Sequence, residues 1–278
     1  MADLVLEPRG PFSLAASGRF LGEFPPADHT GVDADGSVRL GFVRDDFSGV
    51  AAVKLRQPRE DGQVEVFGDN DVRRQLERIL GLEHDGDAFV AVLDRDPVLR
   101  ELWERTGHLR QVSFPSPYEA ACWSVIALRL RQPQAVQVRR RIEATLGDGA
   151  FPAPARLAEL DTVEGLSEIK AQRLRAMARA ALEGRLDPYE LRALPQDDAI
   201  ARLRELPGLG PFYASLVLLR ATGATDAFSP IERLRQAAAR AYDLSEPPTE
   251  EGFAAMAERW RPFRSWACVL LRAGERSR

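Results

Sequence analysis

The chain of 278 residues has little of several features that mark whole classes of protein. Its two cysteines, Cys122 and Cys268, are too few for a disulfide framework or for a four-cysteine zinc or iron–sulfur site. His29, His84 and His108 show no metal-ligand spacing, so we expect no metal site. No apolar run approaches the roughly 18–20 residues that a membrane-spanning helix needs, and the N-terminus lacks the charged-then-apolar layout of a secretion signal. A reducing, cytoplasmic setting without membrane contact is expected.

Lysine is equally scarce, because Lys54 and Lys170 are the only two and all other basic side chains are arginine. The net charge of −4 is unevenly spread along the chain. Residues 1–109 hold 13 basic and 21 acidic side chains, whereas residues 110–278 hold 25 basic and 21 acidic ones. We therefore expect any surface that binds phosphate groups to lie in the second, basic part.

Short stretches rich in β-branched residues and bounded by Gly, Asp or Pro predict four strands, at 4–8, 37–43, 49–55 and 63–68. Helical spacing of apolar residues predicts an aspartate-capped helix after residue 71 and a second helix at about 97–105. From residue 115 onward only helical patterns remain. They predict helices at 118–131, 134–146, 155–160, 167–183, 188–193, 197–205, 211–222, 230–242, 248–258 and 262–273. Asp197 or Asp198 is expected to cap the helix at 197–205.

These patterns predict an α+β protein with two domains. Residues 1–109 are expected to form a small antiparallel β-sheet domain with helices. Residues 110–278 are expected to form an all-α domain.

One turn between two predicted helices contains LPGLGPFYA, residues 206–214. Gly208 and Gly210 carry no Cβ atom, so the main chain there can approach a ligand closely. The helix that follows begins with unpaired N–H groups and the positive end of its dipole. Together these features favour a binding site for an anion such as a DNA phosphate. An ordinary turn between two packed helices is the alternative interpretation.

The motif TDAFSPIERLRQ (225–236) follows this turn, and the pair in this order resembles the HhH-GPD superfamily of DNA repair glycosylases. Three further segments are similar to its 3-methyladenine DNA glycosylase II (AlkA) branch: SPYEAACWSVIALRLRQPQA (116–135), GLSEIKAQRLRAMARAALEGRL (165–186) and ERWRPFRSWACVLLR (258–272). Within residues 115–273 the resemblance rests on sequence motifs. In the first third of the chain it rests only on the order of predicted elements, since the family also carries an N-terminal sheet domain.

The resemblance implies an enzyme that rotates a damaged nucleotide out of double-stranded DNA and hydrolyses its N-glycosidic bond. A carboxylate stabilises the positive charge that develops on the sugar, and the family's catalytic aspartate falls at Glu232. One branch of the superfamily attacks the sugar with a lysine at the seventh position of the motif that forms the glycine turn. That position is Phe212 here and no lysine follows Lys170, so we expect hydrolysis alone. No cofactor is implied, except a monovalent cation on the carbonyl groups of the 206–211 turn, and the protein is expected to act as a monomer.

The resemblance also implies which residues meet DNA and the displaced base. The expected DNA contacts are Leu206, Gly208, Gly210, Phe212, Arg129 and Arg131, with Arg139–Arg141 as further phosphate contacts. The candidates for the base pocket are Phe212, Tyr213, Trp123, Trp266 and Arg272, which stands where the family has a stacking tryptophan.

Each assignment has a structural alternative. Trp123 and Trp266 fit a helical core better than a pocket. Arg129 and Arg131 also fit a solvated face, and Glu232 also fits the first turn of an exposed helix. Asp226 is expected to cap a turn. Two alternative functions remain. One is a DNA-binding protein on the same scaffold that has lost catalysis. The other is a helical structural protein in which the 206–214 turn only packs two helices together.

Overall fold

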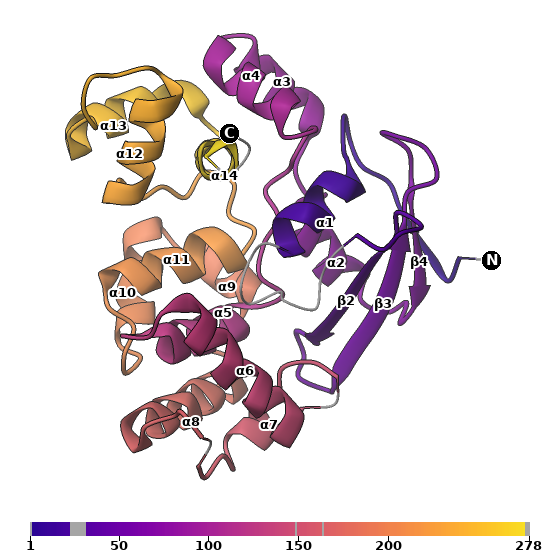
Figure 1. Cartoon of the computed structure of the whole chain (residues 1–278), viewed down its shortest axis with the longest axis vertical. Coiled ribbons are helices and arrows are strands. Elements are labelled where there is room, and N and C mark those ends of the chain that lie inside the picture. The colour runs from indigo at the N-terminus through magenta and orange to yellow at the C-terminus, as the bar shows by residue number, and fades with distance from the viewer. Residues whose placement is uncertain (1, 23–31, 148, 163, 276–278) are drawn as a thin grey trace.

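The computed structural model describes residues 2–22, 32–147, 149–162 and 164–275. Figure 1 shows a twisted sheet on one side and helices stacked along the other. The strands are β1 (Leu4–Leu6), β2 (Val38–Val43), β3 (Val50–Arg56) and β4 (Val64–Gly68). They pair antiparallel in the order β1-β4-β3-β2. The four predicted strands are confirmed to within two residues at each end.

Four helices accompany the sheet: α1 (Leu14–Gly22), α2 (Arg73–Leu80), α3 (Gly86–Leu93) and α4 (Pro97–Arg105). The predictions of α2 and α4 are confirmed, but α1 and α3 were not predicted. α1 contains two glycines, Gly18 and Gly22, and the run Ala88–Leu93 of α3 is apolar throughout, so it shows no helical alternation of apolar and polar residues. The expected aspartate cap of α2 is wrong, because Val72 occupies the N-cap without a side-chain hydrogen bond.

The rest of the described chain is helical, as predicted. The helices are α5 (Pro117–Ala127), α6 (Gln132–Leu146), α7 (Pro154–Leu157), α8 (Glu168–Leu182), α9 (Pro188–Ala193), α10 (Gln196–Arg204), α11 (Pro211–Ala221), α12 (Glu232–Ala241), α13 (Glu250–Ala257) and α14 (Arg264–Gly274), with a 3₁₀ turn at Glu258–Trp260. One predicted cap is wrong: Pro195 is the N-cap of α10, and Asp197 and Asp198 lie inside its first turn. The α+β class is confirmed.

Two hydrophobic cores hold the molecule together, and they do not follow the predicted boundary after residue 109. The first core joins the sheet and α1–α4 to α12–α14, so that Phe89 of α3 stacks on Trp266 of α14 with ring centroids 3.9 Å apart. The second core lies among α5–α11. The C-terminal helices thus pack with the sheet domain, and the middle helices form a separate unit, as their places in Figure 1 also show.

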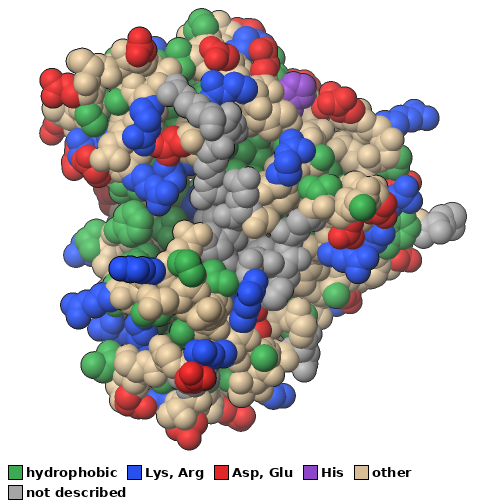
Figure 2. Space-filling model, in the orientation of Figure 1, with side chains coloured by type: hydrophobic (Ala, Val, Ile, Leu, Met, Phe, Trp, Pro, Cys, Tyr) green, Lys and Arg blue, Asp and Glu red, His purple; other side chains and the backbone are tan. Residues whose placement is uncertain are grey.

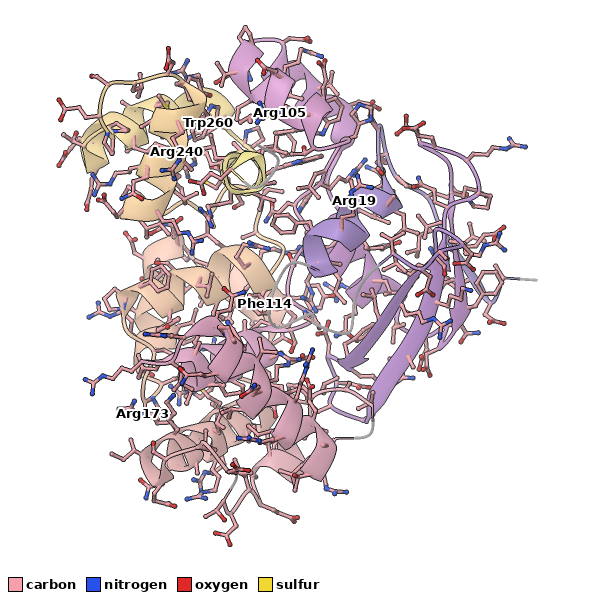
Figure 3. All side chains as sticks on the ribbon, in the orientation of Figure 1. Arg19, Arg105, Phe114, Arg173, Arg240 and Trp260 are labelled. Carbon is pink, nitrogen blue, oxygen red and sulfur yellow. The ribbon has the colours of Figure 1, made fainter. Side chains whose placement is uncertain are left out.

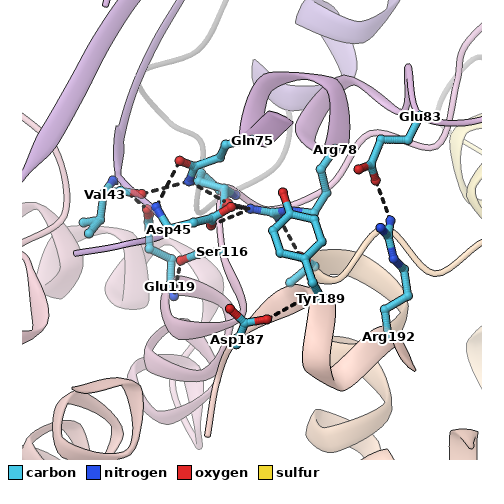
Figure 4. A network of polar contacts seen from close by, with 12 residues as sticks. Val43, Asp45, Gln75, Arg78, Glu83, Ser116, Glu119, Asp187, Tyr189 and Arg192 are labelled. Atoms are coloured by element: carbon cyan, nitrogen blue, oxygen red, sulfur yellow. Dashed lines mark hydrogen bonds and ion pairs between the residues drawn. The ribbon is translucent and has the colours of Figure 1, made fainter. Parts of the chain in front are cut away.

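A polar network joins the sheet domain to the middle helices (Figure 4). The Gln75 side chain donates to the Val43 carbonyl at 2.9 Å, and Arg192 of α9 forms an ion pair with Glu83. Arg78, which has no exposed side-chain surface, pairs with Asp45 at 2.7 Å. Because a buried guanidinium needs partners to offset its desolvation, this network fixes how the two units sit together.

Candidate nucleic-acid interface and active site

The glycine turn between α10 and α11 is anchored from inside the protein. Leu206 and Leu209 are both buried in the second core, and the Leu209 N–H donates to the Leu206 carbonyl at 3.1 Å. Gly208 has φ +98°, a left-handed conformation that favours glycine, and a Cβ there would lie 3.0 Å from Cδ of Arg173. The apolar residues of the turn therefore hold it in place, while its glycines form the outer surface.

The N-terminus of α11 presents unoccupied donors beside this turn. Gly210 is the N-cap, and no side chain of the described residues caps the helix. Pro211 has no N–H, and the N–H groups of Phe212 and Tyr213 have no partner within the described chain. A Cβ built on Gly210 meets no atom within 4 Å. Open backbone and a positive helix end together are suited to an anion.

Basic side chains surround the turn. Arg173 of α8 lies against Gly208, and Figure 3 labels it at the edge of the middle helices. Arg129 and Arg131, in the loop between α5 and α6, are exposed, which fits both a DNA contact and a solvated face. Lys170 donates to the Ile126 carbonyl at the end of α5 at 2.7 Å. Figure 2 shows Lys and Arg side chains gathered on this side of the molecule, over α8, α10 and α11.

Arg139 does not belong to this basic surface, contrary to the prediction. Its side chain is buried and pairs with Glu119 at 2.9 Å and with Glu143 at 2.7 Å. The two carboxylates hold the pKa of Arg139 above its ordinary value despite burial, while burial itself raises the pKa of Glu119. Arg139 therefore serves the fold of α5 and α6 and is not available to a phosphate.

A cavity of about 360 Å³ opens beside the turn. This volume lies within the roughly 300–1,000 Å³ that small-molecule sites occupy. Its lining comes from the end of α5 and the following loop (Trp123, Ala127, Leu130, Gln132), from α11 (Phe212, Tyr213, Ser215, Leu216, Leu219, Arg220), from the entry into α12 (Ser229, Ile231, Arg233, Leu234), from α14 (Ser265, Cys268, Val269, Arg272) and from α1 (Phe20).

Four of the five candidate pocket residues line this cavity, namely Phe212, Tyr213, Trp123 and Arg272. Phe212 is 49% exposed at the mouth, with its ring edge-on to that of Tyr213. Trp266 does not line the cavity. Its side chain is fully buried, stacks on Phe89 and donates from Nε1 to the Leu109 carbonyl at 2.8 Å. The core interpretation therefore holds for Trp266.

Glu232 stands at the rim of the cavity. It is the first residue of α12, and both its sequence neighbours, Ile231 and Arg233, line the cavity although Glu232 does not. Its carboxylate is 61% exposed and accepts hydrogen bonds from Arg235 at 2.6 Å and Gln236 at 2.8 Å. In this rotamer the carboxylate lies along its own helix, and a change of side-chain torsion is needed to bring it over the opening.

Asp226, expected to cap a turn, has another role. Its carboxylate accepts hydrogen bonds from Nε of Arg264 at 2.8 Å and from Arg261. Arg264 also donates to the Asp226 main-chain carbonyl at 2.8 Å. Asp226 thus ties the segment that leads to α12 to the start of α14, and both of these elements wall the cavity.

Two lining residues have chemical interest that the sequence interpretation missed. Arg233 was overlooked because only Glu232 matched a family motif. Its position directly after Glu232, in the first turn of the same helix, was the signal that could have indicated it. Phe20 was overlooked because α1 was not predicted, and it lines the cavity from the sheet domain. Cys268 also lines the cavity, but burial raises the pKa of its thiol to about 12, so the thiol stays protonated at neutral pH.

In the described residues, no group of three or more His, Cys, Asp or Glu side chains could hold a metal ion. His29 lies outside the residues that the structure describes. A membrane-spanning helix is likewise not found in the described ranges, where none is both long and apolar enough.

Comparison with known proteins finds similarity to DNA glycosylases. No family model matches it. A curated relative, the DNA-3-methyladenine glycosylase of Bacillus subtilis, is 24% identical over 224 residues, which are 75% of this chain and 73% of the relative.

Two solved structures extend this comparison. The 3-methyladenine DNA glycosylase of Archaeoglobus fulgidus superimposes with a TM-score of 0.78 at 25% identity, covering 96% of both chains. The 3-methyladenine DNA glycosylase of Schizosaccharomyces pombe, solved in complex with abasic DNA, has the same fold over 66% of this chain and 94% of its own, with a TM-score of 0.54 at 22% identity. The sequence similarity and the shared architecture agree: the chain is a distant homologue, at about 25% identity, of the HhH-GPD DNA glycosylases of the AlkA-like 3-methyladenine DNA glycosylase family.

Proposed function

We propose that the protein is a monofunctional DNA glycosylase that hydrolyses the N-glycosidic bond of alkylated or otherwise modified bases in double-stranded DNA. One observation carries the proposal. The cavity is bounded both by Phe212 and Tyr213, which follow the glycine turn, and by Ile231 and Arg233, which flank Glu232. A nucleotide displaced from a duplex that is held at the turn would enter this cavity beside the carboxylate.

Binding of the duplex rests on the turn and on the arginines around it. The α11 amides bind one phosphate, and the exposed side chains of Arg129 and Arg131 bind its neighbours. In the turn, the carbonyl groups of Pro207 and Gly208 have no hydrogen-bond donor within the described chain. We propose that a monovalent cation binds these oxygens and adds positive charge next to the phosphate. The protein works as a monomer, because the turn, cavity and carboxylate all belong to one chain.

Hydrolysis rests on Glu232. As the bond to the base lengthens, positive charge develops on the sugar, and a carboxylate close to it lowers the barrier electrostatically. Glu232 leaves Arg235 and Gln236 and turns toward the sugar when the cavity fills, for which its three side-chain torsions suffice. Phe212 stands where a lyase would have its lysine, so the reaction ends with base release and an intact abasic strand.

The test is base release from duplexes that carry single modified bases, measured with the full chain in excess over DNA. Wild type and Glu232→Asp should release base, whereas Glu232→Gln should be slower by about a hundredfold or more, since the charge is lost and the shape is kept. Glu250→Gln is the matched control, because Glu250 is the first residue of α13 and is exposed. Equal rates for Glu232→Gln and Glu250→Gln would remove Glu232 from the mechanism.

A second candidate function, favoured by the outward rotamer of Glu232, is a DNA-binding protein of the same family without catalysis. The hydrogen bonds from Arg235 and Gln236 hold the carboxylate away from the cavity in the free protein. This candidate predicts tight duplex binding and no release of any modified base by wild type, so the same assay separates the two functions.

A further inference from the structure

The charge of the cavity lining points to a particular class of base. Three arginines line it, Arg220, Arg233 and Arg272, and no Asp or Glu is present among the described residues of the lining. We propose that the cavity selects neutral bases that carry carbonyl oxygens, such as deaminated or oxidised purines, and disfavours the cationic N-alkylpurines. This inference rests on the proposed function, since it concerns the base that the same cavity receives.

Arg233 is the uncompensated charge at the opening. It is exposed, lies in the first turn of α12, and makes no hydrogen bond or ion pair within the described part of the chain. A cation at a helix N-terminus is also unfavourable with respect to the helix dipole, so the fold does not benefit from it. A ligand oxygen in the cavity would give this guanidinium the acceptor that the protein does not supply.

Arg272 lies deeper and keeps donors for a ligand. Its Nη1 donates to Glu275, while Nε and Nη2 have no partner in the residues described. Glu275 also pairs with Arg240 and lines a separate small cavity with it. Glu275 is thus shared between two guanidiniums, Arg240 and Arg272, and it leaves part of the positive charge of Arg272 uncompensated. Since Arg272 alone of the three lines the larger cavity, that charge is felt by a bound base.

The aromatic lining does not offset this charge. A cationic base gains most from the face of an electron-rich ring. The Phe20 ring already has the Arg220 guanidinium over it, with 5.3 Å between Cζ and the ring centroid. Trp123 is buried except for a small part of its side chain. Phe212 and Tyr213 remain for stacking, and stacking favours neutral bases as well as charged ones.

The consequence is a preference set by charge and by hydrogen-bond donors. A guanidinium repels a base that bears a positive charge, and it donates to carbonyl oxygens such as O6 of hypoxanthine or O8 of an oxidised guanine. Arg272 and Arg233 are therefore the residues to which we assign the specificity of the cavity.

The experiment measures binding of the full chain to duplexes that differ in one nucleotide, hypoxanthine or 7-methylguanine, each with a 2′-fluorine on its sugar to prevent base loss. We expect wild type to bind the hypoxanthine duplex at least about tenfold more tightly. Arg272→Gln and Arg233→Gln should each reduce this ratio by about tenfold. Arg105→Gln is the control, because Arg105 of α4 (Figure 3) pairs with Glu101 and lines the separate small cavity but not the larger one, and it should leave the ratio unchanged.

Tighter binding of the 7-methylguanine duplex by wild type, equal binding of both, or an equal effect of all three substitutions would overturn the inference. Arg233 has no partner to lose, so its variant keeps the fold even if Arg272→Gln does not. Base release from the same duplexes without fluorine is measured separately. A binding preference without any release would contradict the proposed hydrolysis and leave the selectivity standing.

Discussion

Arg78 of the sheet domain donates from Nη1 to the carbonyl oxygen of Ala221, the last residue of α11, at 2.7 Å. The other end of α11 begins at the glycine turn. The acidic sheet domain therefore holds the far end of the helix whose near end faces DNA in the proposed function. This contact gives the sheet domain a bracing role.

The first prediction concerns this brace. Arg78→Met should lower the free energy of unfolding by about 3 kcal/mol, because it leaves the partly buried Asp45 carboxylate and the Ala221 carbonyl without their donor. Arg73→Met is the control on the same helix, since Arg73 pairs with Glu77 at the surface, and it should cost less than about 1 kcal/mol. Chemical denaturation measures both variants. Similar losses for the two would show that the buried contacts of Arg78 do not hold α11 to the sheet domain.

The second prediction concerns the glycine turn. Gly210→Asp should weaken duplex binding by about tenfold or more, because a carboxylate would stand where the phosphate is expected, whereas Gly210→Ala should bind DNA nearly as wild type does. Both variants should fold normally, as a Cβ at Gly210 meets open space. Fluorescence anisotropy with a labelled duplex measures the affinity. Undiminished binding by Gly210→Asp would favour the interpretation of the turn as a mere helix–helix link.

The third prediction separates two arginines that look alike in the sequence. Arg131→Gln should weaken binding to all duplexes and lower the slope of log affinity against log salt by about 1, without loss of stability. Arg139→Gln should instead lower the free energy of unfolding by about 3 kcal/mol, since Glu119 and Glu143 lose their buried partner. Salt titrations and thermal unfolding test the pair. The assignment fails if Arg131→Gln leaves the salt slope unchanged.

The fourth prediction concerns pH. Burial first, and then the positive charges of Arg192 and Arg110, lower the pKa of His84 to about 4 from an ordinary value of 6.5. Between these pH values His84 is therefore protonated in the unfolded chain and neutral in the folded chain. The free energy of unfolding should consequently fall by about 2 kcal/mol from pH 7.5 to pH 5 through His84 alone.

His84→Gln tests this assignment, because glutamine does not titrate. The free energy of unfolding of this variant should lack that part of the pH dependence. The difference in unfolding free energy between wild type and variant should therefore change as the pH falls from 7.5 to 5. Curves that run parallel from pH 7.5 to pH 5 would show that His84 is not buried in its neutral form.

Most of the fold could be predicted from local patterns. The helices from α5 to α14 are bounded by Pro and Gly, whose backbone preferences act within a few residues. The cores could not be predicted in this way. Trp266 and Phe89 are far apart in the sequence, and their stacking, which joins α14 to the sheet domain, depends on tertiary packing alone.

The candidate site was predictable where a motif fixes the position and less so where packing decides. Phe212 and Tyr213 follow the glycine turn and line the cavity as expected. Arg139 and Arg131 both lie in an arginine-rich stretch, and only the carboxylates that the fold brings to Arg139 distinguish them. Phe20 reaches the cavity from a helix without a clear signal in the sequence.

The most direct measurement is a crystal structure of the protein with duplex DNA that contains a 2′-fluorinated modified nucleotide. Our account predicts that the nucleotide occupies the cavity, that a phosphate contacts the amides beside Gly210, and that the Glu232 carboxylate has left Arg235 to lie about 3–3.5 Å from the sugar C1′. A filled cavity with the Glu232 carboxylate still bonded to Arg235 and Gln236 would contradict the account.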